Sequence, residues 1–124
     1  MTLQKRYRNQ IETVRTILDL SREIVKQNNP LDVFLTHHFR SNRKYGSRDR
    51  KLISGAVFGY FRWYGWLRRL QGEKDDLSLL LGYLLDGNPV NEMIHFWAGQ
   101  CGLGEEMAVS LSDAYGQGIE KQRK

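Results

Sequence analysis

Apolar residues recur every three or four positions through most of the chain, which is the spacing of helices that bury one face. The first predicted helix covers residues 3–27. Its apolar face comprises Tyr7, Ile11, Val14, Leu18 and Val25, widened by Ile17 and Ile24. A second helix is predicted over residues 31–39, where Pro30 opens the helix and Asn29 acts as its N-cap.

A third helix is predicted to start after Ser47, which is a good N-cap residue, and to continue to about Leu67. Its broad apolar face includes Tyr60, Phe61 and Tyr64. We therefore expect these three aromatic side chains in the core.

Two glycines, Gly55 and Gly59, lie one turn apart inside this third predicted helix. Each destabilises a helix by about 1 kcal/mol relative to alanine. Close approach of another helix, for example the N-terminal one, would compensate for this cost because glycine has no side chain to hold the backbones apart. We therefore predict a tight helix–helix contact at Gly59.

Shorter helices are predicted at residues 77–85, 90–101 and 105–115, and no segment shows the strict alternation of a strand. The sequence therefore predicts an all-α fold, a single-domain bundle of about six helices. The domain is expected to cover residues 1–118, with residues 119–124 as a tail or the start of a linker.

The composition agrees with one globular domain, since 40% of the 124 residues are apolar and 27% are charged. The single cysteine, Cys101, excludes an internal disulfide. No run of about 18 apolar residues is present that could span a membrane. These features predict a cytoplasmic protein with no membrane partner.

The charge is distributed unevenly along the chain. Residues 1–70 contain 15 Lys and Arg against 5 Asp and Glu, whereas residues 71–118 contain 1 Lys against 8 acidic residues. A basic half beside an acidic half indicates a surface that meets a polyanion. The alternative is that the two halves are solvated faces which differ in sign.

No motif for catalysis or metal binding is present in the sequence. His37 and His38 are adjacent, so on a helix they point about 100° apart and cannot face one metal ion. His95 is the only other imidazole, and Cys101 lies among glycines and apolar residues, where an inert buried thiol is expected. We therefore predict no catalytic residue, no metal site and no cofactor in this chain.

The basic run from Arg40 to Lys51 leads into a row of aromatic residues. Aromatic and arginine side chains together suit RNA binding, because bases stack on both. Arg62, Trp63 and Trp66, together with Arg69 and Tyr45, are the better candidates for an exposed surface. The alternative is that the tryptophans belong to the core, where tryptophan is more often found.

Two short motifs resemble those of a known family. The residues "RDR" at 48–50 open the third predicted helix, and "FGYFR" follows at 58–62. Their order and spacing resemble the NusB-like helical domain, shared by the NusB antitermination factor and the N-terminal region of the RsmB/NOP2/Sun family of RNA cytosine-C5 methyltransferases. The resemblance covers roughly residues 3–70 and implies an RNA-binding helical bundle.

The continuation "RWYGWLRRL" at 62–70 is more similar to the methyltransferase branch. That branch carries S-adenosylmethionine in a separate Rossmann-like domain with paired Pro-Cys motifs, and neither feature occurs in this chain. The resemblance therefore implies an accessory domain without activity of its own, from a parent RNA m5C methyltransferase. A gene that continues past Lys124 into such a domain would favour this interpretation.

Two alternatives stay open. The chain could be a free-standing NusB-like protein-interaction module in transcription antitermination, with its acidic half facing a basic protein. It could also pack on its own methyltransferase domain and contact RNA weakly or not at all.

For RNA, expected to be ribosomal, the predicted contacts are cations that neutralise phosphates and add little base specificity. They are Lys5, Arg6, Arg8, Arg40, Arg43, Lys44, Arg48, Arg50, Lys51 and Arg62. The amides of Ser47 and Arg48 at the helix start are a further candidate for phosphate binding. Asp49 would repel phosphate, so we expect it to act as a cap or as an ion-pair partner that fixes the loop.

Overall fold

The computed structural model describes residues 2–71 and 75–103, and within them it contains six helices and no strand. The helices are α1 (Leu3–Lys26), α2 (Leu31–Ser41), α3 (Ser47–Arg62), α4 (Tyr64–Gln71), α5 (Asp75–Leu85) and α6 (Glu92–Gln100). The all-α prediction is confirmed. The helix predicted over residues 105–115 and the tail at 119–124 lie outside the described residues.

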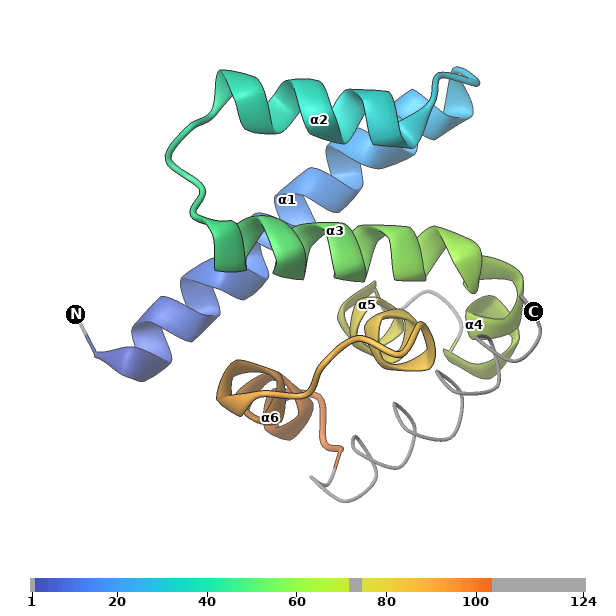
Figure 1. Cartoon of the computed structure of the whole chain (residues 1–124). Coiled ribbons are helices and arrows are strands. Elements are labelled where there is room, and N and C mark those ends of the chain that lie inside the picture. The colour runs from blue at the N-terminus through green and yellow to red at the C-terminus, as the bar shows by residue number, and fades with distance from the viewer. Residues whose placement is uncertain (1, 72–74, 104–124) are drawn as a thin grey trace.

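Helix α3 occupies the centre of the bundle (Figure 1). It packs against α5 on one side and against α1, which crosses behind it, on the other. Helix α2 packs on α1 and runs in the opposite direction to α3, and α6 contacts both α1 and α5. The start of α1 and the loop between α2 and α3 consequently lie on the same side of the molecule (Figure 1).

The core forms where the apolar faces of these helices meet. Helix α1 contributes residues at the predicted spacing, including Val14, Ile17 and Leu18, each 1% exposed or less. Helices α2, α3, α5 and α6 supply the rest of the main cluster, with Trp97 as its largest fully buried side chain. A smaller cluster of Leu67, Leu81 and Leu85 joins α4 to α5.

The predicted close approach at Gly59 is confirmed, and its partner is α5. A Cβ atom added to Gly59 would lie 2.5 Å from the carbonyl oxygen of Gly82, and one added to Gly82 would lie 2.8 Å from that of Gly59. Such distances leave no room for any side chain, so the two backbones cross in direct contact. This crossing fixes the position of α3 on α5.

The helix ends differ from the predictions at two positions. Asn29 is not the N-cap of α2, because its N–H donates to the carbonyl of Ile24 (3.0 Å) and so closes the end of α1; Pro30 takes the N-cap position. Ser47 is not an N-cap either, because it is the first residue of α3 and Gly46 precedes it without a side-chain cap.

The third predicted helix is wrong beyond Arg62, because the chain turns at Trp63 and begins α4. The turn buries Leu67, which is 1% exposed, against Leu81 and Leu85 of α5. The expected core position of Tyr64 is therefore wrong as well: the turn rotates it outward and leaves it 42% exposed. Tyr60 is buried as predicted, and Phe61 is half-buried against the core.

Candidate nucleic-acid interface

The loop between α2 and α3 is held in place at both ends. The side-chain amide of Asn42 donates to the carbonyl of His38 (2.9 Å), which satisfies the end of α2. Tyr45 stacks on His38 with ring centroids 5.9 Å apart and meets Phe39 edge-on at 6.0 Å. The cations of this loop therefore extend from an ordered aromatic support.

The start of α3 is tied to α1 by one side-chain hydrogen bond. The amide of Gln10 donates to the carboxylate of Asp49 at 2.8 Å. Asp49 thus joins the two helices through a neutral amide, and among the described residues it is neither the predicted cap nor an ion-pair partner. Because no side chain caps α3, the backbone amides of its first turn remain without a side-chain acceptor.

A groove of about 1100 Å³ lies between the start of α1, the face of α3 and the connection from α5 to α6. Arg6 enters it from α1, and Arg48 and Lys51 enter it from α3. The acidic residues on its walls are Asp49, Asp86 and Glu92. Beside the start of α3, the groove has three cations, Arg6, Arg48 and Lys51, against the one carboxylate of Asp49, so this part of it is predominantly basic.

Two smaller grooves continue around the loop. A groove of about 270 Å³ shares Arg6 with the first and adds Lys44. A third, of about 430 Å³, shares Tyr45 with the second and is lined by Arg40, Arg43 and Arg50. The three grooves therefore form one path around the start of α3. We call its cations the basic belt, apart from Arg62, which lines the first groove at the far end of α3. They are Arg6, Arg40, Arg43, Lys44, Arg48, Arg50 and Lys51.

The structure thus brings together seven of the ten cations predicted for RNA binding, and all ten are exposed. Among the described residues, no carboxylate forms a salt bridge with a member of the basic belt. Lys44 lies over the ring of Tyr45, with 5.3 Å from its Nζ to the ring centroid. Unpaired exposed cations in one path give this side of the molecule a positive potential.

The other three predicted cations are not part of the basic belt. Lys5 and Arg8 are on α1 but line none of these three grooves, because a helical step of 100° per residue turns them away from Arg6. Arg62 is at the far end of α3, where its Nη1 donates to both carboxylate oxygens of Asp86 at 2.7 and 2.8 Å. The guanidinium of Arg62 is therefore already engaged in joining α3 to α5.

The aromatic residues divide between core and surface. Trp63 is half-buried on the Leu67 cluster, and its Nε1 lies 3.4 Å from Asp86 Oδ1. Trp66 is 40% exposed and meets Trp63 edge-on. Tyr45 is half-buried between the loop and α2. The side chain of Arg69 lies outside the described residues.

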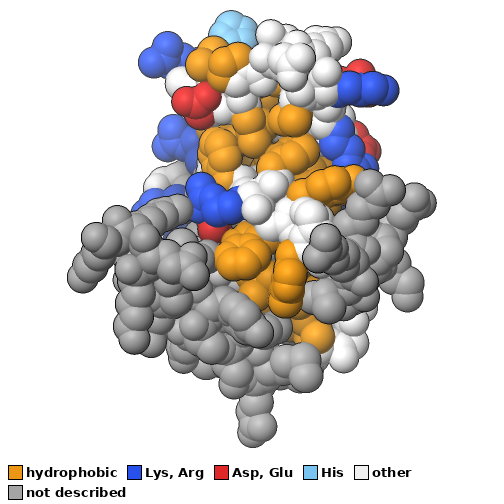
Figure 2. Space-filling view, turned by 90° about the vertical axis from the view of Figure 1, so that its right-hand side faces the viewer, with side chains coloured by type: hydrophobic (Ala, Val, Ile, Leu, Met, Phe, Trp, Pro, Cys, Tyr) orange, Lys and Arg blue, Asp and Glu red, His pale blue; other side chains and the backbone are white. Residues whose placement is uncertain are grey.

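Apolar side chains run down the middle of the face on which α3 ends and α4 begins, with charged side chains of both signs along its margins (Figure 2). This face is turned about 90° away from the view of Figure 1, on the side opposite the α2–α3 loop. Large apolar side chains exposed on α2 and α4 include Val33, at 61%, and Tyr64, at 42%. We call this exposed apolar surface, which includes Val33, Tyr64 and Trp66, the apolar band. The basic belt and the apolar band therefore occupy different ends of the molecule.

Two groups with titratable or nucleophilic chemistry, His38 and Cys101, have shifted pKa values. Burial lowers the pKa of His38, and Lys44 and His37 add to this effect, so the neutral imidazole that stacks on Tyr45 is favoured. Burial raises the pKa of the Cys101 thiol, with a contribution from Asp76. In the part of the chain that the structure describes, no three His, Cys, Asp or Glu residues gather in a way that could hold a metal ion.

Two contributors to this site carried no clear signal in the sequence. Gln10 has the pattern of any polar residue of an amphipathic helix, but its side chain anchors α3. Phe39 has the pattern of any core residue, but it lines the third groove. The one available signal is that two aromatic residues, Phe39 and Tyr45, lie close to Lys44 in the sequence. This proximity is compatible with an aromatic support for the cations.

Comparison of the chain with family models, curated proteins and solved structures finds no match. Fold and site define a helical bundle with a basic belt at one end. Within residues 2–71 and 75–103, no helix is long and apolar enough to cross a membrane. The NusB-like resemblance of residues 48–62 stays a prediction.

Proposed function

We propose that this chain is an RNA-binding accessory domain, similar to the N-terminal domain of an S-adenosylmethionine-dependent rRNA cytosine-C5 methyltransferase. The observation that carries the RNA-binding part is the basic belt, in which α1, α2, the following loop and α3 each supply cations to one path of grooves. The methyltransferase part is supported by the resemblance at residues 48–50 and 58–62.

In this function, the backbone of an RNA strand follows the grooves around the start of α3. Arg and Lys side chains neutralise successive phosphates and release counterions, which gives affinity without base readout. The uncapped first turn of α3, at Ser47 and Arg48, offers backbone N–H groups and a positive dipole end to a phosphate between the cations. The domain would thus hold RNA in a fixed position for a catalytic domain of the parent enzyme.

Salt dependence of RNA binding tests the proposal. The affinity for single-stranded RNA, measured by fluorescence anisotropy between low and moderate salt, should fall with a slope of about −0.7 in log K against log salt per phosphate neutralised. Replacing Arg43, Lys44 and Lys51 together with glutamine should make this slope shallower by about 2.

A charge-matched control separates the belt from the total charge. Lys26→Gln removes one exposed cation at the last turn of α1, far from the loop, whereas Lys51→Gln removes one within the belt. We expect Lys26→Gln to leave the slope unchanged and Lys51→Gln to reduce it by about 0.7. Equal effects of the two variants, or no measurable RNA binding at low salt, would contradict the proposal.

A second candidate function is protein binding through the apolar band (Figure 2). Exposed Tyr64 and Trp66 favour it, because aromatic side chains are enriched at protein interfaces. A NusB-like interaction module would use this end of the molecule while the basic belt stays free. If the triple belt variant binds RNA as the unmodified chain does, protein binding becomes the better interpretation.

A further inference from the structure

The third groove has a composition unlike that of the other two. Its volume is about 430 Å³, and its lining residues are Thr36, Phe39, Arg40, Arg43, Tyr45 and Arg50. We call it the arginine hollow. All polar side chains on its walls are hydrogen-bond donors, since guanidinium groups only donate and the Thr and Tyr hydroxyls can donate. A hollow of this chemistry is complementary to a ligand with several anionic acceptor oxygens.

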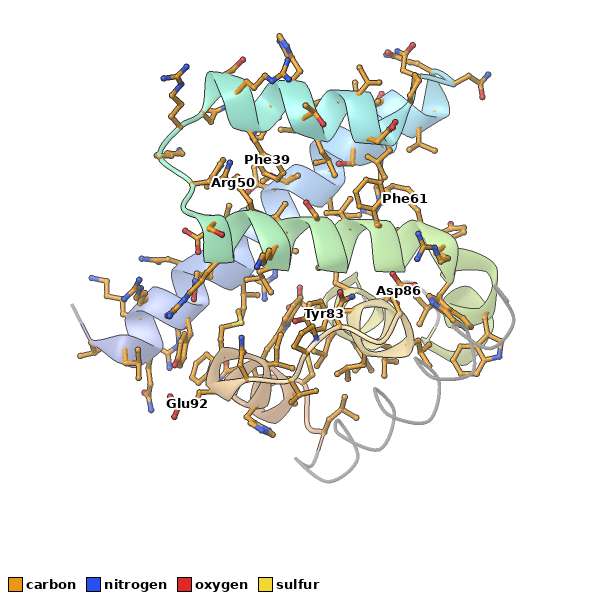
Figure 3. The ribbon with its side chains drawn as sticks, viewed as in Figure 1. Phe39, Arg50, Phe61, Tyr83, Asp86 and Glu92 are labelled. Carbon is orange, nitrogen blue, oxygen red and sulfur yellow. The ribbon has the colours of Figure 1, made fainter. Side chains whose placement is uncertain are left out.

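The three arginines that line the hollow come from three separate elements. Arg40 is in the last turn of α2, Arg43 is in the loop, and Arg50 is in the first turn of α3. Figure 3 shows Arg50 in the space between α2 and α3, beside Phe39. Among the described residues no carboxylate lines the hollow or forms a salt bridge with these arginines. Their mutual repulsion is thus compensated by no protein group that the structure describes.

The walls of the hollow are pre-formed. Phe39 and Tyr45 meet edge-on, and Tyr45 also stacks on His38, so both aromatic rings are held by packing. The loop that carries Arg43 is closed at its start by the Asn42 amide on the carbonyl of His38. A ligand therefore has only the arginine side chains to order, which lowers the entropy cost of binding.

We propose that the arginine hollow binds the terminal phosphomonoester of an RNA strand, while the remainder of the basic belt holds the strand's internal phosphates. This inference rests on the proposed RNA-binding function and assigns a ligand to one part of it. An internal phosphodiester carries one negative charge, whereas a terminal phosphate carries about −1.5 to −2 at pH 7 and has three free oxygens. Three arginines on the walls of one hollow match the terminal phosphate better than the internal phosphodiester.

The test compares short RNA oligonucleotides of one sequence that carry a 5′-phosphate, a 3′-phosphate or hydroxyl groups at both ends. One of the two phosphorylated forms should bind about tenfold more tightly than the hydroxyl form, a difference of about 1.4 kcal/mol. Which phosphorylated form gains affinity tells which end of the strand enters the hollow. Arg43→Gln and Arg50→Gln should each remove most of this preference.

Lys51→Gln is the matched control, because Lys51 belongs to the basic belt but does not line the hollow. It should weaken all three oligonucleotides equally and preserve the preference. Circular dichroism of each variant verifies the fold, and Arg43, a loop residue, provides a substitution outside the helices.

The outcomes distinguish the inference from the function on which it rests. Salt-dependent binding that is equal for all three oligonucleotides overturns the arginine hollow as a terminal-phosphate site and leaves the RNA-binding proposal standing. Absence of binding to every oligonucleotide overturns both. Tighter binding of a phosphoserine peptide than of any oligonucleotide also overturns the inference, because it assigns the hollow to a phosphorylated protein.

Discussion

Replacing Gly59 with alanine is the sharpest test of the fold. The added Cβ would lie 2.5 Å from the Gly82 carbonyl oxygen and 2.7 Å from its carbonyl carbon. Ordinary van der Waals contact begins at 3.4 Å, so α3 and α5 would have to separate by almost 1 Å. Both partner atoms belong to the backbone of α5 and cannot rotate away.

This separation of α3 from α5 weakens the van der Waals packing around the crossing. A gap of 0.5–1 Å forfeits about a quarter to a half of the dispersion energy of each contact across it, and overpacking substitutions typically cost about 1–3 kcal/mol. Alanine also gains about 1 kcal/mol over glycine in helix propensity. We therefore expect Gly59→Ala to destabilise the protein by about 1–2 kcal/mol, and Gly59→Leu by more.

Urea unfolding followed by circular dichroism measures this change. Gly99→Ala is the control, because a Cβ at Gly99 in α6 meets no atom within 4 Å. It should be neutral or stabilising by up to about 1 kcal/mol. If Gly59→Ala is as stable as the unmodified protein, the two backbones are not in contact and the packing of α3 on α5 described above is wrong.

Two other predictions concern side chains of the core and surface. Burial raises the pKa of Tyr83 to about 12, so its contribution to stability is fully present below pH 10 and is lost as the pH rises from about 10 to 12. Tyr83→Phe, which also removes the hydrogen bond to the Pro89 carbonyl (2.6 Å), should abolish this part of the pH dependence of urea unfolding; an unchanged alkaline profile would refute the assignment. Trp97→Ala should lower the free energy of unfolding by about 3–5 kcal/mol because Trp97 is 1% exposed. Trp66→Ala should lower it by about 1 kcal/mol or less and leave RNA affinity unchanged. An RNA affinity that falls with Trp66→Ala would place a base on this ring instead.

The helices could be predicted from the sequence because their cause is local. The three- and four-residue spacing of Ile11, Val14 and Leu18 specifies both the helix and its buried face, and these residues are in the core. The error at Tyr64 has a tertiary cause. Periodicity alone extends the helix through Tyr64, and only the gain from burying Leu67 on α5 explains why the chain turns first.

The close approach at Gly59 could be predicted, whereas its partner could not. A glycine inside a helix indicates that something lies against it, but the identity of that neighbour depends on how α5 crosses α3. Gly82 is 23 residues away along the chain, and no local pattern connects the two glycines.

The sequence predicts which cations could belong to the candidate site. It does not predict how they are arranged in space. Lys and Arg residues cluster between positions 40 and 51, and this indicates a basic surface around the loop whatever its place in the fold. It does not tell that Arg6 joins this surface from α1, or that Arg62, of the same charge and also exposed, pairs with Asp86. Those outcomes depend on contacts between residues that are 24 or more positions apart, which the sequence does not encode locally.

The two proposals place different demands on this fold. Neutralising internal phosphates needs only a sufficient density of positive charge, so it tolerates small shifts of α3. A terminal phosphate in the arginine hollow needs guanidinium groups from α2, the loop and α3 at one point, so it depends on how firmly α3 is held. The Gln10–Asp49 hydrogen bond fixes the start of α3, and the contact of Gly59 with Gly82 fixes its middle. A selective phosphate site can form beside the loop because α3, which carries three of the seven belt cations, is also the central helix of the core.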